Sequence, residues 1–386
     1  MAETEEIWRR PPGQPHQIKK HSILKLEFGE DKAFELDLQQ RVKDYFDQRD
    51  GRSRKGALPL YLKTGIILAV FVASYLLLVF AVSTIWQGLL LAIVLGFSVA
   101  GIGFNIAHDG GHGAYSKSPR INRLAAMTMD LVGVSSYLWF WKHSVIHHRY
   151  VNITGYDTDI DIGILGRLSP HSPWLPFHRW QHFYLWFLYG FLAAKMEFVD
   201  DFKRIMMGRI GKHGFPRPRG RDLIVFVLGK VVFFSWAFCI PLMFHPLGNV
   251  LLLYAVGVSV LGVTLSVVFQ LPHCAGQADF PLPEEGGRIK TPWAVHQAQV
   301  TLGVNRRSLL LRWPLGGLNF HLEHHLFPTI CHIHYPAIAR IVKETCAKHG
   351  VKYGEHPTFW LGIVSHYRWL RLMGRHQKPM IGRDVV

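Results

Sequence analysis

The sequence predicts an all-α integral membrane protein, with four transmembrane helices in two hairpins and a cytosolic helical cap that holds a metal site. Three observations support this fold. Four segments are long and apolar enough to cross a bilayer, almost all basic residues lie outside them, and histidines gather in three short motifs next to them.

The four apolar segments are residues 58–85, 88–107, 223–244 and 250–271. A helix needs about 20 mainly apolar residues to cross about 30 Å of hydrocarbon, and each segment approaches that length. Only short connections separate the first segment from the second and the third from the fourth. We therefore expect each pair to form a helical hairpin.

Basic residues predict the orientation of the hairpins. Of the 43 lysines and arginines, 41 lie in residues 1–57, 108–221 and 272–386. Because such residues stay on the cytosolic side, both termini and the long central segment are expected there, with the hairpin tips on the other face. Lys63 is near a helix end and can snorkel. Lys230 lies inside the third span and is a functional candidate, with snorkelling or an internal hydrogen bond as the alternative.

Three parts are expected along the chain: a cytosolic N-terminal segment at 1–57, a membrane domain at 58–355 and a cytosolic tail at 356–386. Within the first part, residues 31–48 carry apolar side chains at helical spacing. This pattern predicts a short amphipathic helix, on the membrane surface or against the core, or a solvated helix without function.

Two aromatic segments of the central region, residues 124–141 and 177–198, must begin and end on the cytosolic side. Aromatic residues are typical of the headgroup level of a membrane, so we expect re-entrant or interfacial helices at both places.

The composition narrows the function further. The four cysteines form no C-x-x-C pair, which argues against a disulfide scaffold, a zinc ribbon or a thiolate cluster. The net charge of +16 follows from the cytosolic segments and needs no nucleic acid as a partner. Attraction to anionic headgroups of membrane lipids, or to the phosphates of an acyl carrier, is compatible with this charge.

Histidines are the strongest functional signal, because many of the 23 are grouped. The three motifs are His108-Asp109-Gly110-Gly111-His112, His143-Ser144-Val145-Ile146-His147-His148 and His321-Leu322-Glu323-His324-His325. Helix positions three and four apart share one face, so each motif can present two or three imidazoles from a rigid backbone. All three motifs are expected at the cytosolic side, where they can form one metal centre.

The number of imidazoles indicates two metals. Imidazole suits zinc, copper, nickel and iron, so the ligand type alone does not name the metal. Eight histidines exceed the four ligands of a tetrahedral zinc, but they suit two ions with positions left open for a reacting molecule.

The motifs and their flanking residues resemble those of membrane fatty acid desaturases. The similarity covers about residues 20–355. Segments that resemble the bacterial linoleoyl-CoA desaturase-like branch are Asp157-Thr158-Asp159-Ile160-Asp161-Ile162-Gly163, His178-Arg179-Trp180-Gln181-His182 and Cys331-His332-Ile333-His334-Tyr335-Pro336. The three-motif pattern also occurs in alkane hydroxylases, carotenoid oxygenases and sterol-modifying relatives. The prediction of the substrate therefore depends on the sequences that connect the motifs.

The resemblance implies a di-iron site at the histidine motifs. The implied ligands are His108, His112, His143, His147, His148, His321, His324 and His325, and His273, just after the fourth span, is implied as a ninth. Two departures matter. Gln270 stands near the place of a water-holding asparagine of stearoyl-CoA desaturases, and His321 stands where front-end desaturases often carry glutamine.

The resemblance further implies O₂ as co-substrate and a fatty acyl substrate, either a lipid or an acyl-CoA. The two electrons would come from a separate ferredoxin or cytochrome b5, because the sequence has no Gly-x-Gly-x-x-Gly or His-Pro-Gly-Gly motif. The alternatives are a di-iron hydroxylase, which differs in the mass of its product, and a histidine-rich metal transporter. A transporter would place polar ligands at mid-membrane.

Other residues are expected to line the substrate tunnel or to orient the metal ligands. An acyl tunnel is expected to be lined by the spans and by Trp139, Phe140, Trp141 and Tyr184, which are otherwise interface anchors. Residues that could orient the ligands are Asp109, Asp157, Asp159, Asp161, Asn319 and Glu323. Further histidines with supporting or interfacial roles are His171, His178, His182, His332 and His334.

Overall fold

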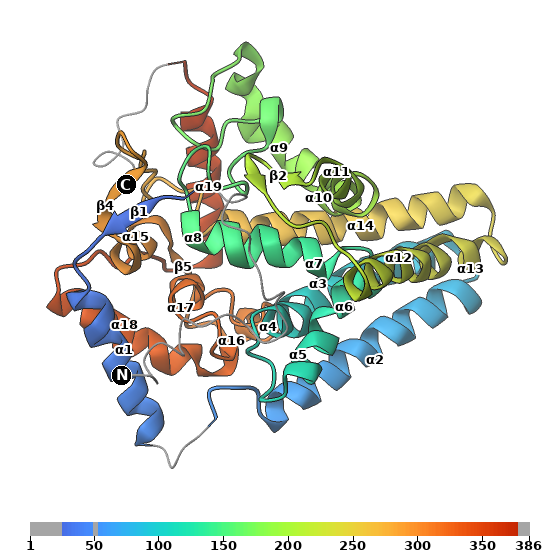
Figure 1. Ribbon diagram of the computed structural model, residues 1–386. Coiled ribbons are helices and arrows are strands. Elements are labelled where there is room, and N and C mark those ends of the chain that lie inside the picture. Colours follow the sequence, from blue (N-terminus) through green and yellow to red (C-terminus); the bar gives the residue numbers. More distant parts are fainter. Residues whose placement is uncertain (1–24, 49–52, 377–386) are drawn as a thin grey trace.

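The computed structural model describes residues 25–48 and 53–376, and this part of the chain is mainly helical (Figure 1). In this part of the chain six short strands form three two-stranded sheets, and the two parallel sheets join distant segments. The parallel pairs are β1 (Glu27–Gly29) with β4 (Arg288–Pro292) and β5 (Gly303–Val304) with β6 (Glu355–His356); β2 (Arg209–Ile210) and β3 (His213–Gly214) are antiparallel.

Four helices are long and apolar enough to cross a membrane. They cover Leu58–Phe80, Ile85–Gly111, Arg221–Leu242 and Leu247–Gln270. The first is α2 and the fourth is α14; the second comprises α3 (Ile85–Ile102), η2 (Gly103–Ala107) and α4 (His108–Gly111), and the third comprises α12 (Arg221–Phe234), η7 (Ser235–Cys239) and α13 (Ile240–Leu242). The predicted number and order of spans are confirmed.

The end of the second span differs from the prediction. We expected the helix to end at Ala107, with the first histidine motif beyond it. Instead the π-helical segment η2 continues the helix into α4, so His108 lies in the last turns of the spanning helix. The helix ends only at Gly110 and Gly111, since glycine is unfavourable inside helices.

The four spans lie side by side and extend away from the rest of the molecule (Figure 1). Helix α3 is central, because it contacts both α2 and α14. Its closest approach to α14 needs glycine, since a Cβ atom on Gly96 would lie 2.5 Å from the carbonyl oxygen of Gly257. Such small residues are typical of contacts between membrane helices.

The segment 124–141, where a re-entrant or interfacial helix was expected, is helical but divided. The structure breaks this segment at Gly133, which has a left-handed φ of +91°. Glycine takes this conformation without strain, and it turns the chain before the second histidine motif. The resulting short helices are α5 (Pro119–Ala126), α6 (Thr128–Leu131) and α7 (Ser136–Trp139).

The segment 177–198 is helical but also divided. Its apolar side chains stay exposed, as expected for an interfacial segment; they include Phe177, Phe183, Phe187 and Phe191. The elements here are η5 (Pro176–Trp180), α9 (Gln181–Tyr189), α10 (Leu192–Lys195), η6 (Met196–Asp200) and α11 (Asp201–Met207).

The predicted amphipathic helix near the N-terminus is confirmed as α1 (Ala33–Asp47). It lies against α18 (Tyr335–Lys348), so its apolar face packs on the core (Figure 1). The other helices of this end of the molecule are α15 (Trp293–Val300), α16 (Leu309–Arg312), α17 (His321–Leu326), η8 (His332–His334) and α19 (Phe359–Met373). Helix α19, from the predicted tail, packs against α9, and its buried Trp369 belongs to the same core cluster as Tyr189 of α9.

Candidate metal centre

The first histidine motif lies where the second span ends. His108 begins α4, and His112 caps its C-terminus. One helical turn separates the two residues, and their ring centroids are 4.8 Å apart. Both imidazoles therefore lie at the C-terminal end of the second spanning helix.

The second motif lies on a π-helix rather than on an α-helix. Segment η3 (Phe140–His147) is π-helical, and His148 begins the short helix α8 (His148–Tyr150). The i→i+5 hydrogen bonds of a π-helix enlarge each turn, so residues four and five apart share a face. His143 therefore faces both His147 and His148, at ring distances of 5.5 and 4.7 Å.

The third motif occupies α17, which is buried along its whole length. Two glycines, Gly316 (φ +58°) and Gly317 (φ +70°), make the preceding turn. A Cβ atom on Gly316 would lie 2.2 Å from the carbonyl oxygen of Phe104. Only glycine allows the turn to approach the second span this closely, and the approach brings α17 to the first motif.

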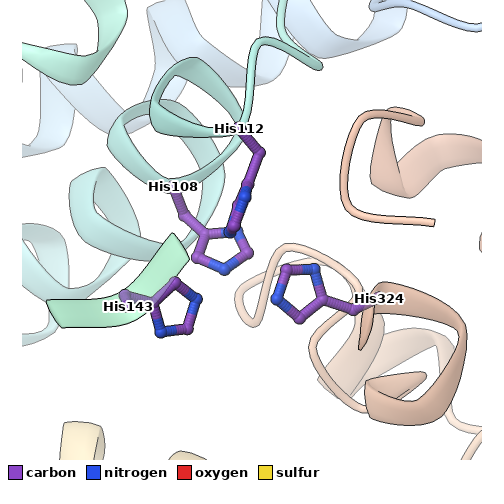
Figure 2. A group of neighbouring side chains, drawn as sticks. All are labelled: His108, His112, His143 and His324. Carbon is purple, nitrogen blue, oxygen red and sulfur yellow. The ribbon is translucent and has the colours of Figure 1, made fainter. Parts of the chain in front are cut away.

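The nine predicted residues form one buried cluster. One group that could hold a metal ion is His108, His112, His143 and His324; another is His147, His273 and His325. In each group the ligand atoms lie within 4.8 Å of one another. Figure 2 shows the first group, whose side chains come from two helices and η3 and point into one space.

His148 and His321 complete the cluster. The ring of His148 lies 4.6 Å from that of His324 and 4.4 Å from that of His325, so it stands between the two groups. The ring of His321 lies 4.8 Å from that of His273. All nine imidazoles are at most 6% exposed.

The ring nitrogens fit a metal site. Many of them are buried and have no hydrogen-bond partner among the described residues; these are Nδ1 and Nε2 of His108 and His325, Nδ1 of His148, and Nε2 of His112, His273, His321 and His324. Buried polar atoms normally have hydrogen-bond partners, so this many unpartnered ring nitrogens in one place indicate that a metal ion binds there. Burial lowers the pKa of His143, His273 and His324 well below the usual range, which keeps their lone pairs available.

Comparison with known proteins agrees with this geometry. The family model described as "Fatty acid desaturase" matches residues 83–357. The chain is 38% identical to an sn-1 linoleoyl-lipid 6-desaturase of Arthrospira platensis, covering 90% of this chain and 95% of that protein. It is 35% identical to a protein of the same name from Synechocystis sp. (91% and 98%), and 36% identical to an acyl-lipid (8-3)-desaturase of Physcomitrium patens (92% and 74%).

The chain belongs to the fatty acid desaturase family. It is a membrane oxidoreductase that acts on fatty acyl chains, and its similarity to cyanobacterial relatives places it in the bacterial branch. The hydroxylase and transporter alternatives are not favoured.

Carboxylates orient part of the desaturase's cluster. Both oxygens of Asp157 lie 3.1–3.2 Å from Nδ1 of His147, and Asp159 lies 3.6 Å from the same nitrogen. Burial lowers the pKa of His147, but these carboxylates outweigh it and raise the pKa overall. The predicted orienting role is therefore met by Asp157 and Asp159.

The other predicted orienting residues have different partners. Asp109 pairs with His332 at 2.8 Å, and Nζ of Lys63 lies 3.2 Å from the second nitrogen of that ring. Glu323 pairs with Arg306 and accepts a hydrogen bond from Tyr353. Asp161 and Asn319 bond to backbone groups of Gly163 and Asn305.

Several orienting groups could not be found from local sequence patterns. The hydroxyl of Tyr335 lies 3.3 Å from Nδ1 of His324, and the carbonyl of Leu318 lies 3.0 Å from Nδ1 of His321. The carbonyl of Val300 lies 3.3 Å from Nδ1 of His273. In each case the contact leaves Nε2 of the histidine free for the centre.

The remaining candidate residues lie in other places. His171 and His178 bond to the carbonyls of Phe280 and Ile164, outside the cluster. His182 packs against aromatic residues, and Phe46 packs on His334. Nε2 of Gln270 lies 3.4 Å from the carbonyl of Asp159, so Gln270 reaches the site only indirectly.

Lys230 is held inside the membrane region by three oxygen atoms. Its Nζ donates to the carbonyls of Gly133 and Glu197 at 2.6 and 2.9 Å and to the carboxylate of Asp201 at 2.9 Å. The alternative of an internal hydrogen bond is therefore confirmed, and the residue ties α12 to the turn before the second motif.

Of the aromatic residues expected around an acyl tunnel, only Trp139 contacts the cluster. It stacks on His143 at 4.6 Å. Trp141 packs with Phe140 and Phe215 instead, and the hydroxyl of Tyr184 donates to a backbone carbonyl. Phe269 of α14, which sequence reasoning missed, lies 6.2 Å from the ring of His143.

An apolar pocket of about 90 Å³ lies between the four spans. Its lining includes Val99, Trp236, Gly257 and Leu261. Leu261 lies on α14 about two turns before Phe269, and His273 follows just beyond the end of this helix. The pocket is therefore separated from the histidine cluster by a short apolar stretch of the bundle.

Proposed function

We propose that the protein is an O₂-dependent di-iron acyl desaturase that inserts a double bond into the acyl chain of a membrane lipid. The observation that carries this proposal is the pair of buried histidine groups around His148, with nine ring nitrogens that have no hydrogen-bond partner among the described residues. Eight or nine neutral imidazoles exceed the needs of one ion. The lipid-linked substrate is supported by the names of the cyanobacterial and moss relatives.

The ligands we propose are the nine predicted histidines. His108, His112, His143 and His324 would hold one iron, His147, His273 and His325 the other, and His148 and His321 would complete the set. Iron supplies the redox chemistry with O₂ that imidazoles lack. The reaction consumes an acyl CH₂–CH₂ pair, O₂, two electrons and two protons, and yields a CH=CH bond and two water molecules.

The protein's own residues would position the substrate and exclude water. The cluster is almost fully buried, and Trp139 and Phe269 are aromatic groups beside His143. We propose that these rings align the acyl chain, because a small misplacement of a reacting bond lowers the rate strongly. The apolar pocket between the spans offers room for a hydrocarbon chain.

The orientation in the membrane is part of the proposal. We propose two helical hairpins with a cytosolic cap, both termini and the histidines on the cytosolic side, because 41 of the 43 basic residues lie in residues 1–57, 108–221 and 272–386, outside the four predicted apolar segments. The division into residues 1–57, 58–355 and 356–386 remains a prediction. Electrons would come from a separate ferredoxin or cytochrome b5.

Expression in a host that lacks the activity tests this function. The acyl lipids should contain a new species lighter by two hydrogen atoms, and it should be absent with His324→Ala at equal membrane abundance. A product heavier by one oxygen atom would instead establish a hydroxylase, and unchanged lipids with folded, iron-loaded protein would contradict the proposal.

A further inference from the structure

Asn152 has an unusual backbone conformation next to the candidate metal centre. Its φ is +57°, and among the described residues only Asn305 shares a positive φ without being glycine. The left-handed region is unfavourable for residues with a Cβ, although asparagine tolerates it better than most. Residues kept in such conformations cluster at functional sites.

The side chain of Asn152 is fully buried and reaches the segment that carries His273. Its Nδ2 lies 3.0 Å from the carbonyl oxygen of His273, 3.2 Å from that of Asp279 and 3.4 Å from that of Val300. Val300 is also the residue whose carbonyl orients the ring of His273. One amide group thus bonds to the backbone of this histidine and to the backbone of two later segments, at Asp279 and Val300.

The backbone of Asn152 reaches the second histidine motif at the same time. Its N–H donates to Asp157 at 2.9 Å, and that carboxylate is the partner of Nδ1 of His147. The rings of His147 and His273 are 5.0 Å apart, and both belong to the group completed by His325. Asn152 is therefore bonded toward two candidate ligands of one site and none of the other.

We propose that Asn152 is a positioning residue that sets the separation of His147 and His273, and so determines metal occupancy at the His147–His273–His325 group. This inference rests on the proposed function. Glycine in its place would keep the backbone conformation but remove the amide, which would free the His273 segment to shift. The neighbouring group, with His108 and His324, should be unaffected.

Asn305 offers a matched control. It has the same left-handed conformation, with φ +46°. Among the described residues, its side chain forms no hydrogen bond to a candidate metal ligand. Asn152→Gly and Asn305→Gly therefore relieve the same kind of strain, while only the first removes contacts to a histidine segment.

The test measures iron per chain and iron affinity by titration against a chelator. We expect Asn152→Gly to lose one iron preferentially, with about 10–100-fold weaker binding at that site, since loss of an outer contact typically has this size. Asn305→Gly should keep both irons. Normal affinity at both sites of Asn152→Gly would overturn the proposal.

A double-mutant cycle tests the route through His273. If Asn152 acts through this histidine, Asn152→Gly should add no further loss of metal to His273→Ala, but should add fully to His108→Ala. Additive losses with His273→Ala would contradict the proposal. So would failure of both Asn152→Gly and Asn152→Asp to fold while the Asn305 variants fold, because Asn152 would then serve folding rather than one site.

Failure of the proposed function would look different. Wild-type protein loaded with zinc instead of iron would contradict the di-iron desaturase, yet the same comparison, measured with zinc, would still decide the role of Asn152. Wild-type protein that binds no metal at the cluster would overturn both.

Discussion

At the scale of single residues, nine buried histidines form one cluster, and hydrogen-bonding groups beside them orient several of their rings. All nine histidines lie in the cluster, because three motifs and the end of a span leave little freedom in where they emerge. Sequence reasoning missed Tyr335 and Asn152. The hydroxyl of Tyr335 contacts the ring of His324 in the preceding helix, and the amide of Asn152 contacts the backbone of His273 in a distant segment. Such contacts follow from packing and have no local pattern.

A buried histidine outside the cluster predicts acid sensitivity. Nε2 of His366 lies 2.7 Å from the hydroxyl of Tyr189, and its Nδ1 lies 2.8 Å from the carbonyl of Cys274. Burial lowers the pKa of His366 to about 4, so the folded state keeps it neutral where the unfolded chain, with a pKa near 6.5, takes up a proton. Its contribution to stability is complete above pH 6.5 and is lost as the pH falls toward 4.

Thermal unfolding in detergent between pH 7 and pH 5 measures this effect. The melting temperature of the wild type should fall toward pH 5, and that of His366→Gln should fall less steeply although it starts lower. An equal slope for both proteins would show that His366 does not titrate in this way.

At the scale of elements, hydropathy predicted the spans well, because length and apolar composition decide whether a helix can cross a bilayer. It failed where single residues redirect the chain. Gly133 divides the segment expected to be a re-entrant or interfacial helix, and η3 is π-helical although its histidine spacing also fits an α-helix. At Gly133 a contact from outside the segment holds the turn, because Nζ of Lys230 donates to its carbonyl.

The turn before α17 gives a prediction at this scale. Gly316→Ala adds left-handed strain of about 1–2 kcal/mol and also a clash with the Phe104 carbonyl, so α17 should move away from the first motif. We expect a lower melting temperature and loss of bound iron.

Gly286→Ala is the control for this change. Gly286 has a φ of +85°, but nothing lies within 4 Å of an added Cβ atom, so this variant adds strain without a clash. It should keep its iron. Equal iron loss in the two variants would attribute the effect to strain and not to the approach of α17.

At the scale of the whole molecule, the distribution of basic residues predicts the orientation of the protein in the membrane. Helix α4, which carries His108, and the C-terminal end of α14, which His273 follows, lie beside α17, away from the loop between α13 and α14 (Figure 1). The short strands that fasten this end, such as β5 with β6, had no signal in the sequence, because two paired residues carry no periodicity.

Cysteine labelling tests the orientation. In a Cys239→Ser background, Lys117→Cys and Glu285→Cys should react with a membrane-impermeant reagent only from the cytosolic side, and Gly248→Cys only from the opposite side. Cys239 is the exposed cysteine among the described residues, so its removal leaves little background. Labelling of all three positions from one side would exclude the proposed hairpins.

The most direct test of the whole proposal is the metal content of the purified protein. Two groups of imidazoles, held by three motifs and His273, should bind about two iron ions per chain, and His147→Ala and His324→Ala should each lower that number without loss of membrane insertion. Elemental analysis of wild type and both variants gives the answer. About two irons, reduced in both variants, is the predicted result; stoichiometric zinc with no iron, or iron unchanged in both variants, would contradict a di-iron centre at this cluster.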